Sequence, residues 1–177
     1  MGLSRNRPHG VWDQGGLIQG QGCFNIDDET WIYYGAWDPR CGPDNYQPRG
    51  GVGIAKLPRD RFGFLAQAKE TSDWRPCDLP ASLVTTAVSC DPTALKFNVE
   101  GVSNDAPLRV ELLTETEQPI PGFSGEQAGL VATDGFESPV AWPSAASASA
   151  LPERAKLRVE FPAQNTARLY AIYSNQS

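Results

Sequence analysis

The sequence is poor in the residues on which most metal sites depend. It has one histidine, His9, which cannot complete a zinc site without other ligands. The four cysteines lack the close paired spacing of zinc ligands; they are Cys23, Cys41, Cys77 and Cys90. We therefore expect no metal ion and no cofactor. The cysteines leave open three disulfide pairings or free thiols in a reducing compartment, and the sequence slightly favours free thiols.

Positive charge and long apolar runs are also scarce. The 15 basic residues are scattered singly in a chain of net charge -6, so none of them forms a cluster that could bind nucleic acid or an anionic membrane. No run reaches the length of a membrane-spanning helix, and residues 1–9 lack the apolar core of a signal peptide. We expect a soluble chain with neither nucleic acid nor membrane as partner.

Several catalytic arrangements are missing as well. No Ser-His-Asp order and no Cys-His pair stands out, and the glycines near residues 15, 20 and 50 precede no helix that could bind a phosphate. No two carboxylates are placed convincingly for glycoside hydrolysis, which needs them about 5 to 10 Å apart. We assign no catalytic residue.

Short strands and turns are what the sequence does contain. With 17 Gly, 15 Pro and 40% hydrophobic residues, it is typical of a turn-rich all-β protein. Two aromatic runs flank the acidic turn at residues 27–29 and predict a β-hairpin. Apolar runs at 51–57 and 62–65 follow, so residues 1–70 are predicted to form a sheet of about four antiparallel strands, as in one propeller blade. Such a blade alone would be poorly covered.

The second half predicts an antiparallel β-sandwich. Periodicity fades over residues 71–92, which we interpret as a linker with at most one strand near 83–88. From residue 93 to 177, apolar and polar residues alternate in several short segments separated by turns. The apolar residues of the clearest segments are Leu95, Phe97 and Val99; Leu108, Val110 and Leu112; and Leu157, Val159 and Phe161.

One part of this half resembles a known family. The string LRVELL at 108–113, an acidic turn and PIPGFS at 119–124 are similar to the C-terminal sandwich of family 32-like glycoside hydrolases. Three further strings follow in the same order: VAW at 140–142, AKLRVEF at 155–161 and ARLYAIY at 167–173. Upstream strings resemble the last propeller blade of those enzymes more weakly: GVWDQG at 10–15, ETWIYYG at 29–35 and GVGIA at 51–55.

The resemblance implies an all-β protein made of a partial five-bladed propeller followed by a sandwich. In that family the acidic nucleophile and the general acid lie in earlier blades, which have no counterpart in this chain. The resemblance thus implies a glycosidase whose catalytic residues lie elsewhere. Because a chain that begins inside a propeller would lose its parent's signal peptide, the localisation of the parent protein, secreted or not, stays open.

Two tryptophan–aspartate pairs are candidates for binding carbohydrate. Trp12 beside Asp13, and Trp37 beside Asp38, join an aromatic face to a carboxylate that can bind sugar hydroxyls, and Arg40 adds a donor. The alternative is that both tryptophans pack in the blade and both aspartates cap turns, which their positions favour by about two to one.

The leading hypothesis is a C-terminal portion of a glycoside hydrolase that supports the catalytic propeller and contributes to carbohydrate binding. Its partners would be an oligo- or polysaccharide and the missing propeller half or another chain. An autonomous carbohydrate-binding module is the first alternative, motivated by five Trp and five Tyr. A structural or protein-interaction sandwich, which would use uncovered faces or strand edges, is the second.

Overall fold

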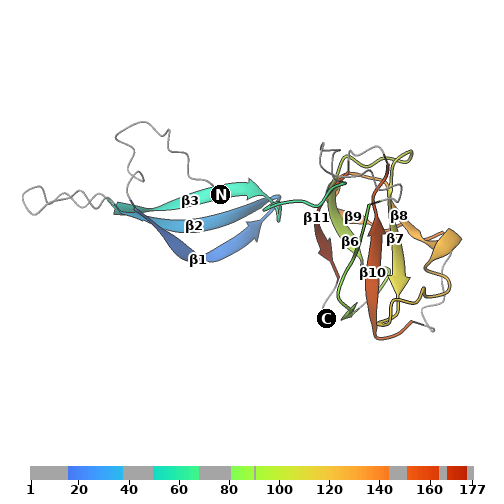
Figure 1. Ribbon diagram of the computed structural model, residues 1–177. Helices are drawn as coiled ribbons and strands as arrows, with labels where there is room; N and C mark the ends of the chain where they lie inside the picture. Colours follow the sequence, from blue (N-terminus) through green and yellow to red (C-terminus); the bar gives the residue numbers. More distant parts are fainter. Residues whose placement is uncertain are drawn as a thin grey trace, which may run out of the picture. The chain divides into compact units, whose positions relative to one another are not determined.

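A computed structural model describes residues 16–37, 50–67, 81–89, 91–143, 151–163 and 167–174. The chain divides into two compact units, Met1–Arg61 and Phe62–Ser177 (Figure 1). All strand pairings are antiparallel, and the described residues hold no α-helix, only the 3-10 turn η1 (Gly125–Gln127). The predicted all-β class is confirmed. In these ranges no helix could cross a membrane.

The first unit contains one three-stranded sheet, which we call the N-terminal sheet. Its strands are β1 (Gly16–Ile26), β2 (Glu29–Trp37) and β3 (Gly50–Pro58), in the order β1-β2-β3. The predicted hairpin is confirmed: a two-residue turn joins β1 to β2, and Asp27 adopts a left-handed φ of 51°, which aspartate tolerates better than most residues.

The fourth strand predicted for this sheet, at residues 62–65, is not part of it. After β3 the chain turns at Asp60, whose φ is 57°, and the Arg59 N–H donates to the Asp28 carbonyl. Asp60 also joins a polar cluster: its N–H donates to Thr30 Oγ1 and its carboxylate accepts from Asn25 Nδ2. These bonds turn the chain across the β1–β2 turn instead of back along β3.

The residues that follow belong to the second unit. Leu65 forms an antiparallel bridge with Leu169, each N–H donating to the other's carbonyl at 2.8 and 2.9 Å. The structural division therefore falls between Arg61 and Phe62. The sequence-based domain limits at residues 70 and 92 stay a prediction, although two short strands, β4 (Ser82–Val84) and β5 (Val88–Ser89), lie inside the predicted linker.

The second unit, which we call the C-terminal unit, contains two antiparallel sheets (Figure 1). One has the order β4-β10-β7-β8, with β5 also paired to β10, and the other has the order β11-β6-β9. The remaining strands are β6 (Lys96–Glu100), β7 (Leu108–Leu113), β8 (Gly129–Val131), β9 (Gly135–Pro139), β10 (Arg154–Glu160) and β11 (Arg168–Tyr173).

Side chains from both sheets bury themselves in one hydrophobic core. Phe97 and Val99 of β6 are fully buried, as are Val110 of β7 and Val159 of β10. The alternation read from the sequence thus identified the inward positions of three strands. Burying an apolar side chain of this size contributes about 1.5 to 3 kcal/mol, so this shared core stabilises the unit.

The loop after β7 closes one end of this core. Ile120 and Phe123 are buried. The Ile120 N–H donates to the Leu112 carbonyl, and the Leu112 N–H donates to the Phe123 carbonyl. Gly122 has φ 85°, a left-handed conformation that glycine adopts without strain, and the chain bends there. The segment 119–124 therefore acts as part of the core.

Candidate interaction surfaces

The predicted carbohydrate site lies almost wholly outside the described residues. This applies to Trp12, Asp13, Asp38 and Arg40. Trp37 is the last residue of β2, paired with Gly16 on one side and Gly50 on the other. The described residues therefore do not test this site, and it stays a prediction.

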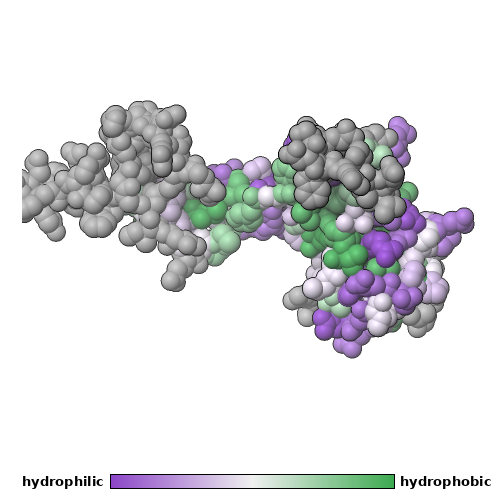
Figure 2. Space-filling view, viewed as in Figure 1, coloured by the Kyte–Doolittle hydropathy of each residue, from purple (hydrophilic) through white to green (hydrophobic). Residues whose placement is uncertain are grey.

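The described surface has another candidate, on one face of the N-terminal sheet. The strand register places six large apolar or aromatic residues on that face, which we call the aromatic face: Phe24, Ile26, Trp31, Tyr33, Val52 and Ile54. Phe24 is 58% exposed and Val52 is 76% exposed, and Ile26 and Ile54 are also exposed. Hydrophobic residues reach the surface of this sheet in Figure 2. Contiguous exposed apolar residues of this kind are typical of an interaction surface.

A charged pair lies on the same face around Trp31. Lys56 Nζ lies 3.8 Å from the centre of the Trp31 ring, and Glu29 Oε2 accepts hydrogen bonds from both Lys56 Nζ and Trp31 Nε1. The bond from Lys56, followed by that from Trp31, lowers the pKa of Glu29. The two charges offset each other, so this end of the aromatic face carries little net charge.

These contacts suit a packing partner better than a sugar. A glycan stacks on a free aromatic face and needs free polar groups beside it. One side of the Trp31 ring is covered by Lys56, and the indole N–H is used by Glu29. The Phe24 and Tyr33 rings meet edge to face at 76°, which gives no flat platform. The aromatic face can therefore bury apolar surface but offers little for recognising hydroxyls.

The opposite face of this sheet is better covered. Thr30 and Ala36 are buried, and the Tyr34 ring lies directly over the backbone of Gly53. A Cβ atom on Gly53 would come within 2.3 Å of that ring, so a larger residue there would force the Tyr34 side chain to move. Among the described residues, the buried positions of this sheet thus lie on the opposite face, and the aromatic face is the more exposed of the two.

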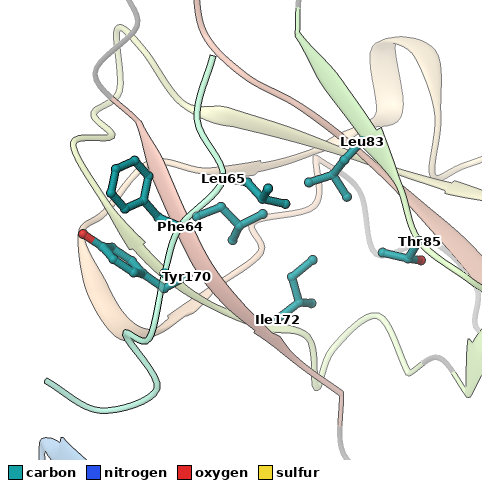
Figure 3. A pocket seen from close by; sticks show the side chains of 8 residues that line it. Phe64, Leu65, Leu83, Thr85, Tyr170 and Ile172 are labelled. Atoms are coloured by element: carbon teal, nitrogen blue, oxygen red, sulfur yellow. The ribbon is translucent and has the colours of Figure 1, made fainter. Parts of the chain in front are cut away.

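A second candidate surface is an apolar groove of about 470 Å³ in the C-terminal unit. Figure 3 shows Phe64 and Leu65 on one side, Leu83 and Thr85 from β4 and the segment after it, and Tyr170 and Ile172 from β11. Because β4 and β11 are edge strands of different sheets, the groove lies where the two sheets are open to the side. Figure 2 shows a hydrophobic area in the part of the unit that holds β11.

The polar side chains that line this groove are already bonded within the protein. Tyr170 Oη donates to Glu100 Oε2 at 2.8 Å. Thr85 Oγ1 donates to the Thr86 carbonyl and accepts from the Leu157 N–H. The groove therefore presents hydrocarbon and aromatic surface and does not supply the polar groups that orient a sugar.

Among the residues that the structure describes, the most buried carboxylate belongs to an ion-pair network on β7 and β10. Glu111, with a side chain 7% exposed, lies 3.0 Å from Arg109 and 3.1 Å from Arg158, and it accepts from the Gly125 N–H. Arg109 also pairs with Glu160 at 2.9 Å. Two carboxylates thus share one guanidinium and hold the loop around Gly125 against β7. The bonds of both carboxylates thus lie within the protein, where they connect β7, β10 and the loop around Gly125.

No cluster of three or more metal-binding side chains exists among the described residues. Cys23 is exposed and its thiol is free. The other three cysteines lie outside the described ranges, as does His9.

Sequence reasoning did not single out either candidate surface. For the aromatic face a signal existed, since Phe24 and Ile26, Trp31 and Tyr33, and Val52 and Ile54 all alternate with period two. For the groove none existed, because residues 62–67 meet β11 about a hundred positions later and no local pattern encodes that contact.

Comparison with known proteins assigns no family or function to the chain. No protein-family model matches the chain, and neither a curated protein nor a solved structure matches it significantly.

Proposed function

We propose that this chain is the C-terminal portion of a glycoside hydrolase similar to family 32, and that its role is to support the catalytic propeller. In this proposal the N-terminal sheet is the terminal blade and the C-terminal unit is the sandwich. The observation that supports it is the aromatic face, which is exposed in the described part of the chain, because a blade buries such a face against its neighbour.

The N-terminal sheet supports the blade half of the proposal. Its strands are antiparallel and consecutive in order, and its exposed face is dominated by aromatic and β-branched residues. A pair of opposite charges, Glu29 and Lys56, lies on that face and is already bonded within the sheet. Because these two charges are already paired, a neighbouring sheet with an apolar face could cover the aromatic face with only a small desolvation penalty.

The C-terminal unit supports the sandwich half. Two antiparallel sheets share one core, and strands β7 and β10 coincide with two strings on which the family resemblance depends. The PIPGFS string buries Ile120 and Phe123 beside them. Apolar residues of the strings that resemble the family therefore contribute to the core of this unit.

The proposal also holds that the chain alone does not hydrolyse glycosides. The carboxylates of the central network, Glu111 and Glu160, are ion-paired, and the groove has no free polar side chain among its lining residues. Asp13 and Asp38, the aspartates predicted to bind carbohydrate, lie outside the described part of the chain, and we assign neither of them a catalytic role.

The test is a panel of fructan, arabinan and aryl-glycosides incubated with the purified chain. We expect no turnover above a buffer blank. Turnover that Asp13→Asn or Asp38→Asn abolishes would contradict the proposal. A positive test is available in the DNA immediately upstream, where we expect an open frame that encodes acidic propeller blades.

A protein-interaction role is the second candidate, and the same aromatic face favours it. The two are separated by the partner: a hydrolase portion packs against blades of its own enzyme, whereas an interaction module binds another protein. A carbohydrate-binding module is supported by no described contact. Saturable glycan binding that is lost in Trp12→Ala or Trp37→Ala would revive it.

A further inference from the structure

The outer edge of β3 carries backbone groups that point away from the sheet. Pro58 pairs with Glu29, and the Arg59 N–H donates to the Asp28 carbonyl at 2.8 Å. Bonded and non-bonded pairs alternate along an antiparallel ladder. Since the β2–β3 register has no shift, odd-numbered residues of β3 bond to β2, and Val52, Ile54 and Lys56 turn their N–H and carbonyl groups outward.

This edge has no partner strand in the described part of the chain. The sheet ends at β3, and the segment that could have covered it, residues 62–65, bonds instead to β11. Proteins usually protect such an edge with a free charge, a proline or a bulge. Here Pro58 is the last residue of the strand, Lys56 is held over Trp31, and the β2–β3 register is regular.

We propose that the β3 edge pairs with the β3 edge of a second copy of this chain. The pairing is antiparallel about a two-fold axis at Ile54, which is the middle residue of Gly50–Pro58. In this register Ile54 lies opposite Ile54 of the other copy and Val52 lies opposite Lys56. Val52, Ile54 and Lys56 of one copy thus lie opposite outward residues of the other copy. Each of them donates one backbone hydrogen bond through its N–H and accepts one through its carbonyl.

The side chains fit the same register. Lys56 meets a valine and not another lysine, so the axis brings no like charges face to face. Because both members of each pair are even-numbered, the aromatic faces of the two copies lie on the same side of a continuous sheet. The inference does not depend on the glycosidase proposal, because an edge can pair whether or not the faces of the sheet are covered.

Disulfide trapping tests both the contact and its register in the full chain. In a background with Cys23, Cys41, Cys77 and Cys90 changed to serine, Ile54→Cys places two thiols at a bonded pair, where the Cα atoms are about 5.5 Å apart. Val52→Cys is the matched control, since its two copies would be about 14 Å apart. We expect oxidation to give a covalent dimer with Ile54→Cys and none with Val52→Cys.

A second variant keeps the proposal falsifiable if the serine background does not fold. Ile54→Pro removes one outward N–H and leaves the β2 ladder intact, and edge strands accept such a proline. Sedimentation of the wild-type chain should show a dimer that grows with concentration, is lost in Ile54→Pro and is retained in Ile54→Thr. A monomer at every concentration, a dimer unaffected by Ile54→Pro, or trapping at residue 52 in place of 54 would overturn the proposal.

Discussion

The two units use the same strand pattern with different results. In β6 of the C-terminal unit, Phe97 and Val99 are fully buried, whereas Phe24 and Val52 of the N-terminal sheet are 58% and 76% exposed. Both pairs alternate with polar or small neighbours in the sequence. Alternation therefore determines which face of a strand is apolar, but only a second layer determines whether that face is buried.

The buried core and the open interaction surfaces lie in different parts of the chain. The C-terminal unit closes its core with its own two sheets and with the loop that buries Ile120 and Phe123. The N-terminal sheet keeps one face and one edge open in the described structure. Open faces and edges are where a sheet meets another body. For this reason we propose that the N-terminal sheet makes the contact with a partner and that the C-terminal unit is the stable part of the chain.

The largest expected effect comes from removing the same side chain in each unit. Phe97→Ala opens a cavity in a filled core and should lower the free energy of unfolding by about 3 to 5 kcal/mol. Phe24→Ala, its matched control, removes an exposed ring and should cost less than about 1 kcal/mol. Urea unfolding followed by far-UV circular dichroism measures both. Equal losses would mean that the aromatic face is covered in the isolated chain.

A smaller effect is expected from the buried ion pairs. Glu111→Gln leaves Arg158 and the Gly125 N–H without their carboxylate partner, and we expect a loss of about 1 to 3 kcal/mol. Glu117→Gln is the control, because Glu117 is 56% exposed and pairs only at the surface with Lys156, where the cost should be about 0 to 1 kcal/mol. If Glu111→Gln cost no more than Glu117→Gln, the network would not hold the loop to β7.

The smallest effect is a pH dependence on the aromatic face. The bonds from Lys56 and Trp31 lower the pKa of Glu29 in the folded chain below the ordinary value of about 4.3. Their stabilisation is therefore present above that value and is lost as the pH falls through the lower folded pKa. The Trp31 indole N–H resonance should shift only below pH of about 4.3 and should stay constant in Glu29→Gln. A shift centred above that pH would contradict the contact.

The sequence predicted the inward residues of the C-terminal unit because their burial follows a local period. Phe97, Val110 and Val159 all lie where alternation places them. It did not predict that Asn98 and Glu111, on the supposedly polar positions of the same strands, are also buried. Glu111 is buried because two arginines from β7 and β10 neutralise it, and such pairing is invisible to a hydropathy pattern.

The route of the chain after β3 could not be predicted for a similar reason. Residues 62–65 have the composition of a strand, and local pattern assigned them to the preceding sheet. The Asp60 turn and the bridge from Leu65 to Leu169 send them to β11 instead. The predicted carbohydrate residues, apart from Trp37, lie outside the described ranges, so sequence remains the basis for that site.

Native-state hydrogen exchange on the full chain tests the contrast between the units most directly. We expect the amide of Ile32 in β2 to exchange by local opening, well before those of Val110 in β7 and Val159 in β10, which should exchange only with global unfolding. Slower exchange at Ile32 on dimer formation would fit pairing at β3. Equal protection of all three residues in the monomer would contradict the account, because it would mean that the N-terminal sheet already has the second layer that we infer it lacks.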